Sequence, residues 1–588
     1  MRKKPQARQR DWMRIRFLVL LACTALGLAG VVFQSYRIQI RHGERLRQEV
    51  QRIYQREITV LPARGSIYDR NGEDLAISIP VDSIYARPGR MEDPIGTAKK
   101  LAPILELDSD TILKKLRQDS PFVWLKRQVV PTVSARVRAL GLPGVGIVQE
   151  TRRFYPNLEL GAHLLGFVGV DGQGLDGIEY QYDRLLRGET NRLVVDQDAL
   201  GRPLASAEGL IVARKDGHNL VLTIHKEIQH SAEQRLQEGV EAAKARGGFA
   251  VVMDPRTGEI LAMANVPRFN PNMYHQYPKE VLRNRCAADA YEPGSVFKPI
   301  LVAAALEEKL WKPADVLYCE NGAYRLHDKV IHDVHHYGTL SLAGVIQKSS
   351  NIGAAKIGLS LGAERLYPYI RNFGFGRPSG VDIPGEASGL LRPPKWAPIE
   401  LANISFGQGV AVTPLQLTNA FCALANGGRL MRPFVVREIL DAQGNTVERR
   451  APQELGSVVS PETVRQITEM LIAVVSPEGT GGQAAVDGFQ VAGKTGTAQK
   501  PDPRHGGYLK GKYLASFVGF VPAKEPRLCV LVALDEPQGS IYGGQVAAPV
   551  FREIVRDALG ILGIYPEEQF LAREKGRMTR VGSSSTLQ

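Results

Sequence analysis

The sequence predicts an α+β, multidomain fold: a single N-terminal transmembrane helix, a mixed α/β middle domain, and a C-terminal domain in which helices cover an antiparallel sheet. Three observations support this prediction. The chain has 588 residues, which is more than one hydrophobic core usually serves. Residues 17–36 contain no charged side chain. In the second half of the chain, β-strand patterns alternate with apolar helical patterns.

The uncharged segment is 20 residues long, which is the length that a helix needs to span a bilayer core. Seven lysines and arginines precede it against one acid, Asp11, so the positive-inside rule places residues 1–16 in the cytoplasm and the later residues outside. The alternative is a cleaved signal peptide, because small residues such as Ala25 resemble a cleavage site. The apolar stretch is long for such a signal, and we expect a retained anchor helix at residues 17–36.

The composition excludes some classes of protein and partner. With 44% hydrophobic and 23% charged residues, the chain has the composition of a folded protein. A soluble protein with its net charge of +13 would be a candidate for nucleic-acid binding. Because an anchor is predicted, the expected partner is an anionic lipid surface or cell wall. Nucleic acid is not an expected partner. The five cysteines show no C-x-x-C pair, so the spacing implies neither a zinc site nor a disulfide framework.

The composition divides the rest of the chain into two domains and a tail. Residues 37–57 carry apolar side chains at helical spacing and predict a helix that continues out of the membrane. Short extended segments and glycine turns follow, without a catalytic-looking group of side chains. The pattern changes near residue 216, so we predict a mixed α/β domain over residues 37–215 and a second domain over residues 216–565. The polar residues 566–588 predict a disordered tail.

The second domain alternates buried strands and apolar helices. Its last two strand patterns are joined by a short turn, as in a hairpin, and so are its second and third. These hairpins predict the antiparallel sheet that the helices cover. The predicted strands are residues 220–224, 249–253, 260–264, 515–521 and 528–534, and the predicted helices are residues 226–245, 300–306 and 352–361.

One tetrad in this domain suggests nucleophilic catalysis. Ser295-Val296-Phe297-Lys298 follows the helix breaker Pro293-Gly294 and opens an apolar helix, which would place Ser295 and Lys298 on one face. A serine hydroxyl needs an adjacent base to act as a nucleophile. A lysine can be that base when burial and neighbouring cations lower its pKa. Taken alone, the tetrad fits a serine N-cap followed by a solvated lysine better.

Two further motifs follow the tetrad along the chain. Ser349-Ser350-Asn351 gives an S-x-N triplet, and Lys494-Thr495-Gly496-Thr497 gives a K-T-G-T run that the strand pattern places in the antiparallel sheet. The triplet selects Ser349 over Ser350 as its functional hydroxyl, because Asn351 must lie two residues on. In this order, S-x-x-K, S-x-N and K-T-G resemble the signature of penicillin-binding proteins and class A β-lactamases.

With these motifs, the chain resembles the class B penicillin-binding proteins, which are peptidoglycan D,D-transpeptidases. The resemblance extends from the anchor to about Ile564. Residues 64–72 resemble the opening of the family's elongated pedestal (dimerisation) domain, which implies that the middle domain is this pedestal and the second domain a penicillin-binding transpeptidase domain. Residues 291–294 and 405–409 resemble the division-specific type, FtsI, more than the elongation type.

The resemblance implies catalytic roles for the first two motifs. Ser295 would be the acylated nucleophile, and Lys298 would take its proton. Ser349 would relay a proton to the leaving amine, and Asn351 would hold the amide of the donor peptide. No metal or organic cofactor would be needed. Four histidines within residues 327–336 match no common zinc-ligand spacing, so no metal site is predicted there.

The resemblance also implies roles for the K-T-G-T run. Lys494 would keep the cleft electropositive and lower the pKa of Lys298. Thr495, Gly496 and Thr497 would form the substrate-binding strand, with the two threonines bonded to the substrate's carboxylate. The backbone N–H groups of Ser295 and Thr497 would form the oxyanion hole.

The implied reaction is acyl transfer on D-Ala-D-Ala stem peptides, carried by lipid-linked precursor strands. An amine acceptor gives a cross-link, water gives carboxypeptidase activity, and β-lactams inhibit by acylating the same serine. An FtsW-type glycan polymerase and other division proteins are the implied partners, and the cytoplasmic (inner) membrane at the division septum is the implied location. Alternatives are an elongation-type enzyme, a β-lactam-binding scaffold or sensor without transpeptidation, and a β-lactamase, for which no deacylation motif is found.

Overall fold

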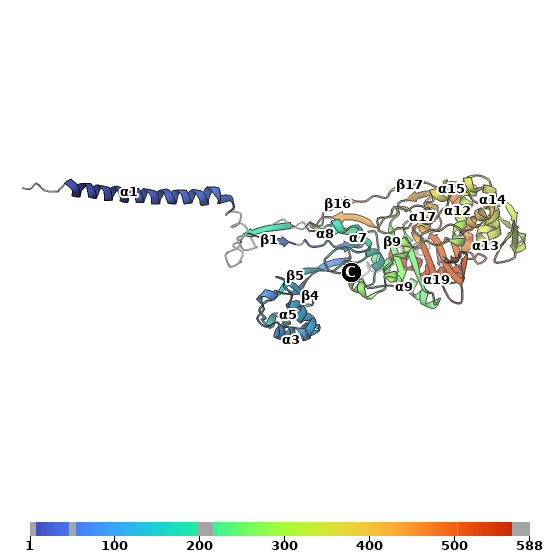
Figure 1. Ribbon diagram of the computed structural model, residues 1–588. Coiled ribbons are helices and arrows are strands. Elements are labelled where there is room, and N and C mark those ends of the chain that lie inside the picture. Colours follow the sequence, from blue (N-terminus) through green and yellow to red (C-terminus); the bar gives the residue numbers. More distant parts are fainter. Residues whose placement is uncertain are drawn as a thin grey trace, which may run out of the picture. The chain divides into compact units, whose positions relative to one another are not determined.

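Figure 1 shows the computed structural model of the protein, which describes residues 7–45, 55–60, 62–189, 191–196, 216–502 and 504–566. The chain divides into two compact units. One comprises residues 1–62 and 189–216, and the other comprises residues 63–188 and 217–588. All but the first residue of the predicted tail, 566–588, lies outside the described residues.

The first unit contains the apolar helix. Helix α1 (Ala7–Tyr36) passes into a π-helical turn, η1 (Arg37–Arg41). The segment Trp12–Arg41 is long and apolar enough to cross a membrane, and its side chains are exposed. Strand β1 (Gln55–Val60) pairs antiparallel with β6 (Asn191–Asp196). The prediction of a helix throughout residues 37–57 is therefore wrong at its end, because pairing with a distant strand leaves no local sequence pattern.

In the second unit, a seven-stranded sheet has the order β16-β15-β7-β2-β3-β4, with β5 paired to β3. Three of its strands come from beyond residue 216, so the sheet runs across the predicted domain boundary. Helices α3, α4 and α5 pack on its β3–β4–β5 end around a separate apolar cluster. The strands are β2 (Ile67–Tyr68), β3 (Asp74–Ala86), β4 (Val123–Val129), β5 (Val145–Phe154), β7 (Asn219–Leu222), β15 (Val436–Leu440) and β16 (Thr446–Arg449), and the helices are α3 (Pro94–Leu105), α4 (Ser109–Leu116) and α5 (Pro131–Ala139).

A buried ion network joins the segments near this sheet. The Glu179 carboxylate pairs with Arg64 at 2.6 Å and with Arg153 at 2.5 Å, and its side chain is 0% exposed. Arg64 also pairs with Asp183 at 2.6 Å. A buried charge left unpaired is strongly destabilising, so these residues serve the fold. Glu179 lies in the short helix α7 (Gly177–Gln181) and Asp183 in α8 (Asp183–Arg187), and a third short helix, α6 (Ala162–Leu165), precedes them.

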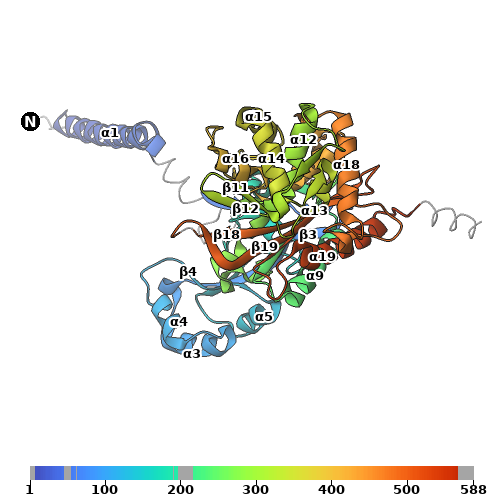
Figure 2. The same ribbon diagram turned by 90° about the vertical axis from the view of Figure 1, so that its right-hand side faces the viewer.

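The predicted antiparallel sheet is present, with five strands in the order β18-β19-β20-β8-β9. Helices α9 (Lys226–Ala242) and α19 (Gly543–Ile561) cover one of its faces, and α17 (Pro414–Ala425) with further helices covers the other. Figure 2 shows this layering. The strands are β8 (Gly247–Met253), β9 (Ile260–Val266), β18 (Ala492–Pro501), β19 (Tyr508–Val521) and β20 (Leu528–Asp535).

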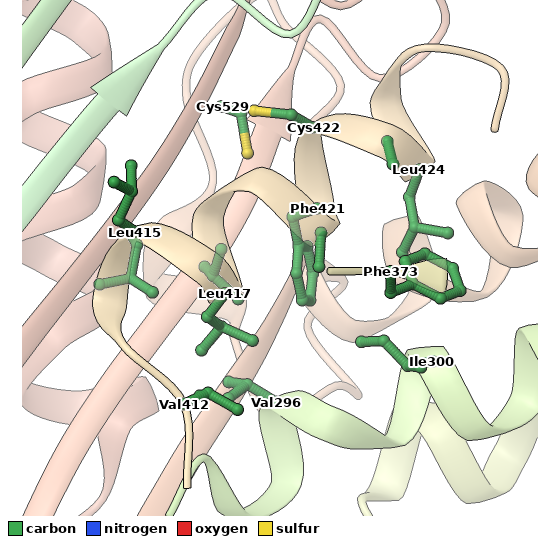
Figure 3. Packing of buried hydrophobic residues seen from close by; sticks show 14 of the residues in the cluster. Val296, Ile300, Phe373, Val412, Leu415, Leu417, Phe421, Cys422, Leu424 and Cys529 are labelled. Atoms are coloured by element: carbon green, nitrogen blue, oxygen red, sulfur yellow. The ribbon is translucent and has the colours of Figure 1, made fainter. Parts of the chain in front are cut away.

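Helix α12 (Lys298–Glu307) lies at the centre of the helical layer. Residues 298–306 are all buried, as the nearly all-round apolar sequence of residues 300–306 predicts for that part of the helix. Val296 and Ile300 belong to the same hydrophobic cluster as Leu417 and Phe421 of α17, as Figure 3 shows. The other helices of this layer are α13 (Leu342–Lys348), α14 (Asn351–Leu361), α15 (Ala363–Asn372), α16 (Pro398–Ser405) and α18 (Pro461–Val475).

Short elements complete the unit. They are η2 (Pro88–Arg90), η4 (Pro271–Gln276), α10 (Lys279–Leu282), α11 (Arg285–Ala288), η5 (Gly294–Phe297), β10 (Val316–Tyr318), η6 (Glu320–Gly322), β11 (Ala323–Leu326), β12 (Lys329–His332), β13 (Thr339–Ser341), β14 (Arg429–Met431), β17 (Glu454–Ser457) and η7 (Gly482–Ala484). Two of them, η5 and β12, lie beside the motif residues described next.

Candidate active site

The S-x-x-K tetrad bridges two elements. Ser295 lies in the 3-10 turn η5, and Lys298 is the first residue of α12, so the expected single α-helix from Ser295 onward is not formed. Gly294, at φ +56°, supplies a left-handed backbone before the serine. Its N–H donates to the carbonyl of Gly407 at 3.0 Å. Residues 405–409 thus support the turn that presents the serine.

The Lys298 amine is buried and reaches the second motif. Its Nζ donates to the Ser349 carbonyl at 2.6 Å, to the Ser349 hydroxyl at 3.3 Å and to Asn351 Oδ1 at 2.8 Å. Burial lowers the pKa of Lys298 to about 7, while the charge of Asp333 opposes the shift. Within the described residues, no hydrogen bond reaches the Ser295 hydroxyl. Catalytic hydrogen bonds often form only when substrate is bound.

The structure separates the two serines of the triplet. Ser349 joins α13 to α14 in a left-handed conformation (φ 61°, ψ 38°). This conformation is unfavourable for a serine by about 1–3 kcal/mol and is typical of functional sites. Ser350 instead caps α14: its hydroxyl accepts from Gly353 N–H at 2.9 Å and donates to Asp333 at 2.6 Å. The Ser349 hydroxyl therefore faces Lys298, and Ser350 holds the helix.

Asp333 belongs to this site and was not identified in the sequence. Its carboxylate accepts from the backbone N–H groups of Asn351 and Ile352, the latter at 3.0 Å. An acid bonded to the first N–H groups of a helix fixes the position where that helix begins. The preceding carbonyl, of His332, accepts from Asn351 Nδ2 at 3.1 Å. No motif marks Asp333, because only the folding of β12 against α14 brings it to the triplet.

In the acylation reaction that the resemblance implies, Asp333→Asn should lower the rate by about tenfold, because one side of the carboxylate that holds α14 becomes a donor. It should also move the pH midpoint of acylation to lower values, since the lost negative charge raises the pKa of Lys298 in the wild type. Acylation rates with a fluorescent penicillin between pH 5 and 9 measure both effects. Asp328→Asn, on an exposed side chain nearby, is the control. An unchanged midpoint would show that Asp333 acts on the helix alone.

Lys494 of β18 completes the contact between the second and third motifs. Its Nζ donates to the Ser349 hydroxyl at 2.9 Å and to Thr495 Oγ1 at 3.3 Å. Burial, with the charge of Lys298 as a second cause, lowers the pKa of Lys494 well below its ordinary value. The Ser349 oxygen thus accepts from both amines. Because a hydroxyl oxygen has two acceptor positions, its own proton is left free to point elsewhere.

The K-T-G-T strand lies directly against the turn that carries Ser295. In the β18–β19 ladder, Gly496 is opposite Ser516. A Cβ on Gly496 would lie 2.4 Å from Ser516 Oγ, 3.0 Å from Val296 Cγ1 and 3.3 Å from the Pro293 carbonyl. Only glycine allows this approach. It brings the backbone of Thr497 beside the turn that carries Ser295.

The threonines of the strand contact two regions that the sequence motifs do not include. Thr495 Oγ1 shares a hydrogen bond with Thr480 Oγ1 at 2.8 Å. Thr497 Oγ1 accepts from the N–H of Gly543, at the start of α19, at 3.4 Å. Thr480 follows α18 in a glycine-rich stretch, and no sequence motif indicates a role for it. It orients the Thr495 hydroxyl.

Glu292, three residues before the serine, joins three parts of the site. Its carboxylate accepts from Gly409 N–H at 2.8 Å and from the Tyr508 hydroxyl at 2.9 Å. It therefore connects the Ser295 turn with residues 405–409 and with the start of β19. Among the described residues, no group of three or more His, Cys, Asp or Glu side chains is placed to hold a metal ion.

Two family models match the chain. The penicillin-binding protein transpeptidase domain matches residues 248–556, and the penicillin-binding protein dimerisation domain matches residues 59–222. The chain belongs to the class B penicillin-binding proteins. This confirms the family that the three motifs indicate, and the folds expected for its two domains.

Curated relatives align with this class B penicillin-binding protein over most of both chains. A probable peptidoglycan D,D-transpeptidase PenA of Neisseria meningitidis is 36% identical, covering 95% of this chain and 94% of the relative. The peptidoglycan D,D-transpeptidase FtsI of Escherichia coli is 36% identical, with 96% and 95% covered. Stage V sporulation protein D of Bacillus subtilis is also 36% identical, with 91% and 84% covered.

Solved structures show the same architecture. Penicillin-binding protein 3 of Mycobacterium tuberculosis, in complex with aztreonam, superposes with a TM-score of 0.68 at 29% identity, covering 87% of this chain and 99% of that one. A peptidoglycan synthetase of Bifidobacterium adolescentis gives a TM-score of 0.69 at 26% identity, with 87% and 98% covered.

Proposed function

We propose that this protein cross-links peptidoglycan stem peptides through an acyl-enzyme on Ser295, as a D,D-transpeptidase of the division type. The observation that supports this most directly is the meeting of three motifs at one hydroxyl. Lys298 and Lys494 both donate to Ser349 Oγ, at 3.3 and 2.9 Å, and both lysines are 0% exposed. Names of relatives such as FtsI and PenA support the same activity.

In the acylation step, Lys298 takes the proton of Ser295 as the serine oxygen attacks the D-Ala-D-Ala carbonyl. A pKa of about 7 gives the amine a large neutral fraction at neutral pH. Ser349 carries a proton to the departing D-alanine amine, which its free hydroxyl proton allows. Asn351, held by Asp333 and by Lys298, bonds the amide of the donor peptide.

The K-T-G-T strand binds and polarises the donor. Thr495 and Thr497 hydrogen-bond its terminal carboxylate, with Gly496 between them, and Lys494 supplies the positive potential that attracts it. The N–H groups of Ser295 and Thr497 bond the developing oxyanion. An amine from a neighbouring strand then attacks the acyl-enzyme and restores the serine. Water in place of that amine gives a carboxypeptidase side reaction, and no step needs a metal or organic cofactor.

The same proposal covers topology and partners. Residues 1–16 are cytoplasmic, residues 17–36 anchor the protein in the inner membrane, and the pedestal (37–215) and transpeptidase domain (216–565) lie outside. One apolar N-terminal helix and the likeness to FtsI support this arrangement. A division role places the protein at the septum beside an FtsW-type glycan polymerase, with lipid-linked precursor strands as substrates and β-lactams as inhibitors.

Intact-mass analysis of the detergent-solubilised full chain with penicillin tests the function. We expect the wild type to gain one penicillin mass and Ser295→Ala to gain none, because only the hydroxyl can form the ester. Ser350→Ala is the control. This serine of the S-x-N triplet caps α14, and the variant should still be acylated. An unlabelled wild type with intact antibiotic would indicate a scaffold, and rapid hydrolysis of the antibiotic would indicate a β-lactamase.

A further inference from the structure

Two cysteines from distant parts of the sequence lie side by side in the transpeptidase core. Cys422 is in α17 and Cys529 is in β20, and these elements pack directly against each other. The Cys529 thiol donates to the Thr418 carbonyl at 3.6 Å. Thr418 lies one helical turn before Cys422, on the same face of α17. Figure 3 shows the two sulfur atoms close together between the helix and the strand.

The surroundings of the pair are apolar and closed. Cys422 is 1% exposed and Cys529 is 0% exposed, and both belong to the main hydrophobic cluster. Burial, followed by the neighbouring thiol of Cys529, raises the pKa of Cys422 well above its ordinary value. Thiols buried in this way do not react in the folded protein, so a bond between Cys422 and Cys529 would have to form before the core closes.

We propose that Cys422 and Cys529 are joined by a disulfide bond in the mature protein. The inference rests on the extracytoplasmic placement given under the proposed function, because exported domains fold in an oxidising compartment. Two S–H bonds break and one S–S bond forms. The two electrons and two protons pass to the disulfide of an exported thiol–disulfide oxidoreductase, which becomes a dithiol.

The bond would link α17, which follows the segment that pairs with the chain just before Ser295, to the five-stranded sheet that contains the K-T-G-T strand. Just before α17, Val412 pairs with Tyr291 through two backbone hydrogen bonds, of 2.9 and 3.0 Å. Tyr291 stands four residues before Ser295. Strand β20 pairs with β19, which in turn pairs with the K-T-G-T strand. Because a disulfide that closes a long loop restricts the unfolded chain most, this link should also raise the melting temperature.

Peptide mapping of the exported full chain tests the bond. Free thiols are blocked with N-ethylmaleimide in denaturant without reductant, and the digest is analysed by mass spectrometry. We expect one cross-linked peptide pair containing Cys422 and Cys529, lighter by two hydrogens than the separate peptides. Cys286 and Cys319 are matched internal controls: both are 0% exposed, but their thiols face the carbonyls of Ala264 and Leu317. Blocking of Cys422 and Cys529 as complete as that of Cys286 would overturn the proposal.

Two further measurements separate this inference from the proposed function. Reductant should lower the melting temperature of the wild type but not of Cys529→Ala, while Cys286→Ala should respond like the wild type. An equal response of all three would contradict the bond. Penicillin acylation is measured on the same samples: acylation with free Cys422 and Cys529 thiols overturns the disulfide alone, and a cross-linked pair without acylation overturns the proposed function alone.

Discussion

Lys298→Met is expected to lower the rate of penicillin acylation by about a thousandfold, within the range that general-base catalysis contributes. Methionine occupies a similar volume but has no group that can take the Ser295 proton. It also leaves the Ser349 carbonyl and Asn351 Oδ1 without their donor. Stopped-flow acylation with a chromogenic β-lactam measures the rate, and a melting curve reports whether the fold is retained.

Lys298→Arg separates the base from the charge. The guanidinium keeps the positive charge and the donors but stays protonated at any working pH, so this variant should be nearly as slow as Lys298→Met. Lys309→Met, on an exposed lysine just beyond the other end of α12, should acylate like the wild type. Substantial activity in the arginine variant would mean that Lys298 acts by its charge, and that another group takes the proton.

The same lysine sets the pH dependence expected of the wild type. Burial lowers the pKa of Lys298 to about 7, so the amine is protonated below that pH and cannot act as a base. The acylation rate should therefore rise from pH 5, reach half its maximum at about pH 7 and level off above pH 8. A midpoint near 10, the ordinary value for lysine, would contradict the assignment.

The sequence predicted the elements that local patterns determine. The apolar run after Lys298 gave the buried α12, and the short apolar segments near the K-T-G-T motif gave β19 and β20. It could not predict where distant strands pair. Strands β1 and β6 pair although they lie far apart in the chain, and β7 joins the sheet of the preceding domain through β2. Such pairings depend on tertiary packing, which no window of sequence contains.

The residues of the candidate site also fall into those that the sequence reveals and those that only tertiary packing brings together. The motif residues were found because their types and order match a known chemistry, and the structure brings Lys298, Ser349, Asn351 and Lys494 into contact. Asp333 was missed because it reaches the triplet only when β12 folds against α14. The residues that hold the motifs in place follow from packing, so the sequence indicates the reacting groups more readily than the groups that position them.

Gly496→Ala is expected to lower the acylation rate by about a hundredfold, the typical loss when one oxyanion-hole donor is removed. The added methyl group would meet Ser516 Oγ at 2.4 Å and Val296 Cγ1 at 3.0 Å, and the two elements must move apart to accept it. Because Thr497 follows directly, its N–H, which we propose as an oxyanion-hole donor, would be displaced. Acylation kinetics measure the loss, and melting curves report the strain.

Two matched variants decide whether this close approach is the cause. Gly560→Ala adds the same methyl group where nothing lies within 4 Å, and should acylate at the wild-type rate. Ser516→Ala combined with Gly496→Ala removes the nearest clashing oxygen and should recover part of the rate, since Val296 still crowds the methyl group. If the double variant is as slow as Gly496→Ala and both bind penicillin normally before acylation, contact with Ser516 does not displace the strand. The spacing between β18 and the Ser295 turn would then be set by Val296 and Pro293.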